Sequence, residues 1–180
     1  MSRSLLALCA LACLATAPTV SAQATPDSAA LRQSRDELRH VVGTWDVTTH
    51  MQNPDGTLAR EVHGTYVFEW VLPGRVVRGV ATQPDLDTVS GILFYLRPGT
   101  AEVEMVSVGP DGRLWVMTGP LGGDTRVSQP YPTTSGGEGR LRFTRSDVTA
   151  DRFESTMEWS EDAGATWKPG NHQIFVRRKG

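Results

Sequence analysis

Hydrophobic and polar positions follow two different periods along the chain. Between residues 28 and 42 the apolar side chains Leu31, Leu38, Val41 and Val42 fall on one side of a helix, and charged residues such as Arg32, Arg35 and Arg39 fall on the other. This spacing is typical of an amphipathic helix. From Thr44 onward apolar and polar residues alternate, which is typical of strands with one buried face. The pattern therefore predicts one helix over 28–42, followed by β-structure.

Turn-forming residues divide the β-region into short segments. Clusters of Gly, Pro, Asn and Asp occur at 53–56, 73–74, 97–100 and 109–112. Residues 120–139 are rich in Gly, Pro, Ser and Thr, and we expect one long irregular stretch there. Strands and helices do not alternate, which excludes a doubly wound α/β fold. The sequence predicts one all-β domain over 28–180, an antiparallel sandwich or barrel of about eight to ten strands.

The first residues have the features of a secretory signal. Arg3 precedes an apolar run from Leu5 to Ala17, and small residues end at Ala22. The run is too short to cross a bilayer as a helix. We therefore expect a cleaved signal peptide over 1–22, a flexible lead over 23–27, and a periplasmic or extracellular protein with no membrane span after cleavage.

The composition and the cysteine positions argue against several classes of function. The 180 residues contain 18 Lys+Arg and 20 Asp+Glu, for a formal net charge of −2, so we expect no nucleic-acid partner. Cys9 and Cys13 both lie in the predicted signal, which leaves no disulfide and no thiolate ligand in the mature domain. No two histidines have the spacing of a local metal-binding motif, so we expect no metal and no cofactor. The histidines are His40, His50, His63 and His172.

Gly43-Thr44-Trp45 lies directly between the predicted helix and the first strand. This placement resembles the calycin barrels, the lipocalins and their relatives, in which a Gly-x-Trp opens the first strand. The resemblance implies an up-and-down antiparallel barrel whose floor is closed by Trp45. It also implies that an arginine of the last strand, Arg177 or Arg178, packs over the tryptophan ring.

A second motif, Trp159–Trp167, lies near the other end of the chain and reads Trp-Ser-Glu-Asp-Ala-Gly-Ala-Thr-Trp. Together with Gly43-Thr44-Trp45 it resembles a family of exported bacterial calycin-like barrels of unassigned function. Those proteins share a Gly-Thr-Trp near the start and a Trp-Ser-x-Asp-x-Gly-x-Thr-Trp near the end. The resemblance covers most of residues 35–178, and it carries no catalytic residues to transfer.

Residues 160–167 also resemble the Asp-box of sialidases and other β-proteins. The resemblance implies a structural hairpin that starts at Ser160. In that hairpin Asp162 would accept hydrogen bonds from backbone amides, Gly164 would take a left-handed conformation, and Trp167 would pack beneath. We interpret the motif as a folding element rather than a carbohydrate site.

Aromatic residues are the main candidates for ligand contact. The chain has five tryptophans, and most aromatic side chains fall on the apolar faces of the predicted strands. A barrel of this size is either filled by such side chains or leaves room for one small ligand. Our leading hypothesis is an exported, non-enzymatic barrel that binds a small apolar or amphipathic molecule. The predicted pocket residues are Tyr66, Phe68, Trp70, Tyr95 and Trp115.

Two alternatives stay open at the sequence level. In the first, Glu69, His63 and Glu104 act as acid and base in a hydrolase- or isomerase-like enzyme, which requires that they converge in one concave site. Period-2 alternation instead favours an outer, solvated face for them. In the second, the protein is a structural or partner-binding envelope protein that acts through residues 120–139.

Overall fold

The computed structural model describes residues 28–179, so the predicted signal over 1–22 and the lead over 23–27 lie outside the described residues. One helix precedes eleven strands, and two single-turn 3₁₀ helices, η1 (Pro84–Leu86) and η2 (Pro98–Thr100), connect strands. Across residues 28–179, no helix is long and apolar enough to span a membrane. The main elements are α1 (Ser28–Val41), β1 (Gly43–Gln52), β2 (Leu58–Leu72), β3 (Val76–Gln83), β4 (Thr88–Arg97), β5 (Glu102–Val108), β6 (Leu114–Pro120), β7 (Thr125–Ser128), β8 (Tyr131–Pro132), β9 (Glu138–Ser146), β10 (Arg152–Ser160) and β11 (Lys168–Arg177).

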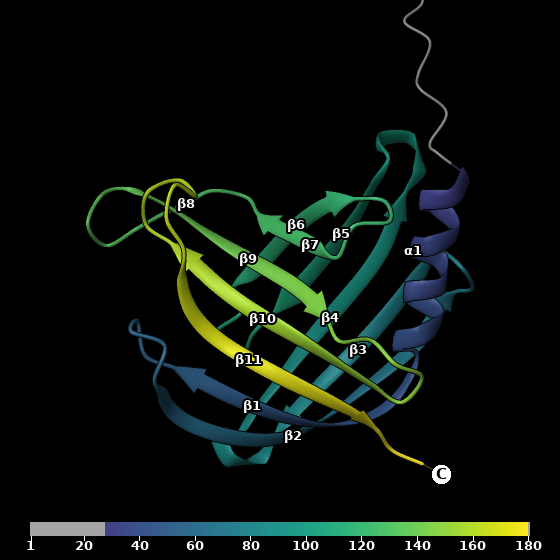
Figure 1. The fold of residues 1–180 in the computed structure, drawn as a ribbon, viewed down its shortest axis with the longest axis horizontal. Coiled ribbons are helices and arrows are strands. Elements are labelled where there is room, and N and C mark those ends of the chain that lie inside the picture. Colours follow the sequence, from purple (N-terminus) through teal and green to yellow (C-terminus); the bar gives the residue numbers. More distant parts are fainter. Residues whose placement is uncertain (1–27, 180) are drawn as a thin grey trace, which may run out of the picture.

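Ten of the strands form a closed antiparallel ring (Figure 1). Strands β1 to β7 pair in chain order, β7 pairs with β9, β9 with β10, and β10 with β11. The ring closes where β11 pairs with β1, with Trp45 opposite Arg177. Strand β8 pairs only with β9 and lies outside the ring. The prediction of an all-β antiparallel barrel behind one helix is confirmed.

Residues 120–139 are not one long irregular stretch, and that prediction was wrong. They contain β7, which supplies the link between β6 and β9, and the short outer strand β8. The buried residues of β7 are Arg126 and Ser128. Because polar side chains occupy the inward positions of β7, the usual apolar alternation is absent there, and the segment reads as a loop.

Helix α1 lies against the end of the barrel where β1 begins (Figure 1). Leu38 and Val41 of the helix are buried in the same core as Trp45. Two hydrogen bonds attach the helix to the loop after β6: the Gly122 amide donates to Ser34 Oγ over 2.8 Å, and Gln33 Nε2 donates to the Gly122 carbonyl over 2.8 Å. The helix therefore covers one barrel end by both apolar packing and hydrogen bonding.

Trp45 forms the floor of the barrel at this end. Its side chain is 0% exposed, and its Nε1 donates to the Val41 carbonyl over 2.8 Å. The Arg177 guanidinium lies 4.1 Å from the indole ring and donates to the Val42 carbonyl (2.9 Å) and the His40 carbonyl (2.6 Å). Arg177, and not Arg178, therefore makes the cation–π contact with this tryptophan.

Gly43 makes the close approach of Arg177 feasible. Its φ is +132°, and a Cβ at this position would lie 2.6 Å from Arg177 Nη1. A larger residue would meet both the unfavourable backbone conformation and the guanidinium. The glycine and the arginine are thus one structural unit with Trp45.

Replacing Arg177 tests the floor directly. Arg177→Gln removes the guanidinium that donates to the His40, Val42 and Ala150 carbonyls and makes the cation–π contact, so it should lower the free energy of unfolding by about 2–3 kcal/mol. Arg178→Gln is the matched control, because Arg178 forms an exposed ion pair with Asp46 and should cost less than about 1 kcal/mol. Urea unfolding followed by tryptophan fluorescence measures both. Equal losses in the two variants would contradict the assigned role of Arg177.

Candidate functional site

A cavity of about 250 Å³ lies inside the barrel. Its lining side chains come from α1 and from every strand of the ring except β7. At about 30 Å³ per water molecule, this is room for roughly eight water-sized groups. Of the two arrangements that the sequence left open, filled and hollow, the structure has a hollow interior.

The middle of the cavity is apolar. Phe153 and Phe175 are stacked with ring centroids 4.2 Å apart, and Phe68 lies 5.9 Å from Phe94. Methionines are flexible and polarisable, so a wall that contains them can adapt to different apolar shapes. The aromatic and methionine side chains that form this belt are Phe68, Phe94, Met105, Met117, Phe153 and Phe175.

A polar rim surrounds the end of the cavity that is opposite α1. Gln173 Nε2 donates to Tyr66 Oη (2.9 Å) and to Thr49 Oγ1 (3.1 Å), and burial raises the pKa of Tyr66. The buried Asn171 Oδ1 accepts no hydrogen bond from any residue in the described part of the chain. Ser90 and Ser107 complete this rim. The rim can offer hydrogen bonds to a polar group of a ligand.

A charged cluster lies at the opposite end, next to α1. Arg126 Nη2 donates to Glu37 Oε1 over 2.6 Å, and Arg145 Nη2 lies 2.9 Å from His40 Nδ1. A guanidinium can only donate, so Nδ1 of His40 accepts, and its Nε2 donates to the Thr149 carbonyl over 2.6 Å. Burial, aided by the charges of Arg145 and Arg177, lowers the pKa of His40. The imidazole is therefore neutral at pH 7.

The predicted pocket residues are only partly brought together. Tyr66 and Phe68 line the cavity. Trp70 and Trp115 pack against the core without lining the cavity, and Trp115 contacts Tyr131 with ring centroids 5.1 Å apart. Tyr95 points outward, where its hydroxyl donates to Glu104. These last three residues do not line this cavity.

The register of individual strands sets which side chains face the cavity. Phe94 and Leu96 of β4 are buried, so Tyr95 between them must face outward. The segment is apolar on both faces, and alternation alone does not say which face is inside. The cavity residues Glu37, Met105, Met117 and Arg145 were not predicted. Alternation within one strand does not say which face of another strand is inside, so Met105, Met117 and Arg145 can be placed only with the pairing of the strands.

The proposed acid–base residues do not form one site. Glu69 pairs with Arg78 on the outer face of β2 and β3, with 2.7 Å between Oε2 and Nη2. The ring of His63 lies 3.2 Å from Glu61, and Glu104 accepts from Arg97 over 2.9 Å on β4 and β5. Each group has a different partner on the outer wall, as the alternation of β2 and β5 requires. The convergence that the enzyme hypothesis needs is absent.

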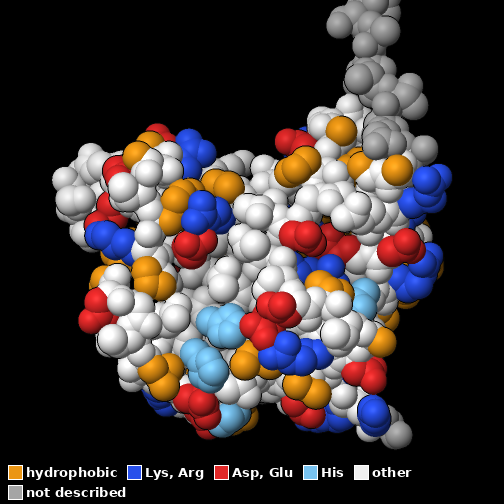
Figure 2. All heavy atoms as spheres, viewed as in Figure 1, with side chains coloured by type: hydrophobic (Ala, Val, Ile, Leu, Met, Phe, Trp, Pro, Cys, Tyr) orange, Lys and Arg blue, Asp and Glu red, His pale blue; other side chains and the backbone are white. Residues whose placement is uncertain are grey.

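Three histidines, His50, His63 and His172, instead lie on one outer face with Glu61 and Glu154. The rings of His50 and His172 are 5.8 Å apart, His50 lies 3.1 Å from Glu61, and His172 lies 2.6 Å from Glu154. Figure 2 shows histidine and acidic side chains gathered on the face formed by β1, β2, β10 and β11. Within residues 28–179, no group of three His, Cys, Asp or Glu side chains is arranged to hold a metal ion.

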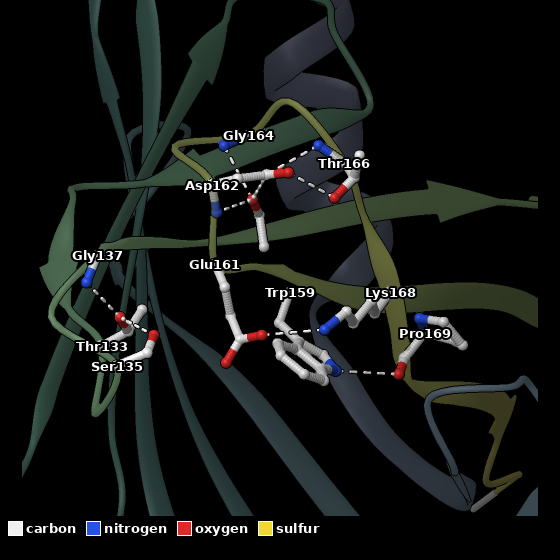
Figure 3. A network of polar contacts seen from close by, with 11 residues as sticks. Thr133, Ser135, Gly137, Trp159, Glu161, Asp162, Gly164, Thr166, Lys168 and Pro169 are labelled. Carbon is white, nitrogen blue, oxygen red and sulfur yellow. Dashed lines mark hydrogen bonds and ion pairs between the residues drawn. The ribbon is translucent and has the colours of Figure 1, made fainter.

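The hairpin between β10 and β11 is held by Asp162 (Figure 3). Its Oδ1 accepts from the Thr166 amide (2.8 Å) and from Ser160 Oγ (2.7 Å), and its Oδ2 accepts from Thr166 Oγ1 (2.6 Å). The hydrogen bonds from Thr166 and Ser160 lower the pKa of Asp162 to about 2. Gly164 has φ +95°, and Trp167 lies beside it. None of these residues lines the barrel cavity.

Comparisons with known proteins were made by family model, by sequence and by structure. No family model matches the chain, and no curated protein matches it. The S-type phycobiliprotein lyase CpeS from Guillardia theta superposes with a TM-score of 0.50 at 14% identity, over 83% of this chain and 97% of that one. The structure of EF1p2_mFAP2b bound to DFHBI has a TM-score of 0.43 at 15% sequence identity, over 81% of this chain and 99% of that one. A de novo designed fluorescence-activating β-barrel has a TM-score of 0.43 at 15% sequence identity, over 79% of this chain and 98% of that one.

The hairpin predicts a specific dependence of stability on pH. The pKa of Asp162 is lower in the folded protein than in the unfolded chain, so its carboxylate stabilises the fold above about pH 4, and this stabilisation is lost as the pH falls toward 2. Asp162→Asn should therefore be less stable than wild type at pH 7, and the difference should shrink between pH 4 and 2. Thermal unfolding across this range measures it.

Glu161→Gln serves as the control for this prediction. Glu161 neighbours Asp162 and forms an exposed ion pair with Lys168 over 2.9 Å, an interaction that contributes little to stability. The stability of the Glu161→Gln variant should stay close to that of wild type across the same pH range. A constant difference between Asp162→Asn and wild type from pH 7 to pH 2 would argue against the assigned role of the carboxylate.

Proposed function

We propose that this chain is a small-ligand-binding barrel for an apolar or amphipathic molecule. The observation that supports it is the cavity of about 250 Å³, with an apolar belt in the middle and polar groups at both ends. Ligand sites in proteins have this character: a concave, mostly apolar wall with a few placed polar groups. The interior of a barrel that served only as a scaffold would be filled by side chains.

The size of the cavity limits the ligand. Space for roughly eight water-sized groups corresponds to a molecule of about ten non-hydrogen atoms. At a ligand efficiency of about 0.3–1.5 kcal/mol per atom, such a molecule can bind with micromolar affinity. We therefore expect a compact metabolite-sized molecule and not a long-chain lipid.

The same proposal places the protein outside the cytoplasm. This part depends on the features of residues 1–22, which are those of a secretory signal, and on the absence of cysteine from residues 23–180. A periplasmic or extracellular barrel would bind its ligand after export. Native mass spectrometry of the protein from its own host would show whether a small molecule is retained.

A cavity-filling substitution tests the proposal. Ala81 lines the cavity and is buried, whereas Thr82 follows it on β3 and faces solvent. Titration calorimetry of the full chain with 1-octanol, a molecule of suitable size, should show one site with micromolar affinity. Ala81→Phe should weaken this binding by at least about tenfold because the added ring takes up ligand space.

Thr82→Phe places the same ring on the outer wall and should bind 1-octanol like wild type. Circular dichroism of both variants checks that the barrel is retained. Equal affinity of Ala81→Phe and wild type, or no binding by wild type, would contradict a ligand site inside the barrel.

A further inference from the structure

Two arginines lie at the α1 end of the cavity, and among residues 28–179 Glu37 is the one carboxylate that lines the cavity with them. Arg145 lines the cavity and is 8% exposed. Arg126 is 0% exposed, and its guanidinium carbon lies 6.0 Å from the ring of Phe94 and 5.8 Å from that of Phe143, both of which line the cavity. Arg126 therefore lies one side chain behind the cavity wall, and Arg145 lies in it.

Both guanidiniums have hydrogen-bond donors without a partner. Arg126 uses Nη2 for Glu37, but no atom of residues 28–179 accepts a hydrogen bond from its Nε or Nη1. Arg145 uses Nη2 for His40, and its buried Nε has no acceptor among the same residues. Buried N–H groups are nearly always paired because an unpaired one loses its hydration without compensation. Of these donors, Nε belongs to Arg145, which lines the cavity, and it can be satisfied by an acceptor that occupies the cavity; Arg126 lies behind the wall and contributes its charge.

The charges at this end do not cancel. Arginine stays protonated in proteins, so Arg126 and Arg145 contribute two positive charges and Glu37 one negative charge. His40 is neutral, since its Nδ1 accepts from Arg145 and its Nε2 donates to Thr149. Asp124 also acts on Arg145. It lines an outer hollow together with Glu37, His40 and Arg145 but not the inner cavity, and its side chain is exposed, so water screens its charge. The inner side therefore has an excess of one positive charge.

We propose that the cavity ligand carries a single carboxylate, which lies against Arg145 with Arg126 behind it, while its apolar body extends along the phenylalanine and methionine belt. This inference rests on the proposed function. A carboxylate matches the excess of one positive charge, and its two oxygens match the planar donor fork of a guanidinium. A phosphate monoester would bring nearly two negative charges into a site that can balance one. The class of ligand is thus a medium-chain monocarboxylic acid.

Octanoate and 1-octanol separate this inference from the proposed function, because they share the alkyl chain and differ in the head group. In titration calorimetry of the full chain at pH 7, octanoate should bind at least about tenfold more tightly than 1-octanol. This is the gain in affinity expected from one charge-assisted hydrogen bond between the carboxylate and Arg145. Arg145→Gln should remove most of this preference, so that its affinities for octanoate and 1-octanol come within about threefold of each other.

Two further variants make the test decisive. Glu37→Gln keeps an acceptor for Arg126 Nη2 but removes a negative charge that lines the cavity, so it should tighten octanoate binding and raise the ratio of octanoate affinity to 1-octanol affinity. Arg142→Gln is the matched control: Arg142 lies on the same strand as Arg145 but faces outward, where it pairs with Glu158 over 2.7 Å and packs on Trp167. It should bind both molecules like wild type.

Each result has a distinct meaning. Binding of 1-octanol with no preference for octanoate overturns the carboxylate assignment and leaves the proposed function in place. Binding of neither molecule overturns both. If Arg145→Gln loses both molecules through a structural defect, the Glu37→Gln variant decides, and an affinity for octanoate no higher than that of wild type overturns the assignment.

Discussion

Closure of the strand ring determines which side chains face the interior. In a ring of ten hydrogen-bonded strands, each strand has a neighbour on both sides, and successive side chains must alternate between the inside and the outside. Trp45 and Arg177 are opposite each other at the seam between β1 and β11, so the cation–π contact and the closure of the ring occur at the same place. The floor, the position of α1 and the cavity above the floor all depend on this pairing.

The cavity follows from the sizes of the inward residues. Around Trp45 the interior is filled by Phe153, Phe175 and the apolar face of α1. Farther along the barrel the inward residues of β3 are small: a Cβ at Gly79 would lie 2.4 Å from Phe68, so the phenylalanine ring lies against the glycine backbone. Ala81 follows on the same face. Bulky residues on one side and small ones on the other leave the space that the ligand is proposed to occupy.

Much of the fold could be predicted from the sequence, whereas the site could be predicted only in part. Period-2 alternation and the turn residues indicated an antiparallel barrel, because each strand needs one apolar face. The strand β7 was missed because Arg126 and Ser128 occupy its inward positions, and a polar inward face does not look like a strand. Arg126 is also central to the inferred ligand chemistry, so the residue that broke the pattern belongs to the site. The direction of Tyr95 could not be predicted because β4 is apolar on both faces, and only its pairing with β3 and β5 sets that direction.

The central claim is that the barrel is hollow in its apolar middle. A crystal structure under xenon pressure tests it directly, since xenon enters apolar cavities and is visible by its scattering. We predict xenon density within the barrel, in contact with Phe94, Met105 and Met117. Side chains packed against one another at that position, with no xenon between them, would contradict the account.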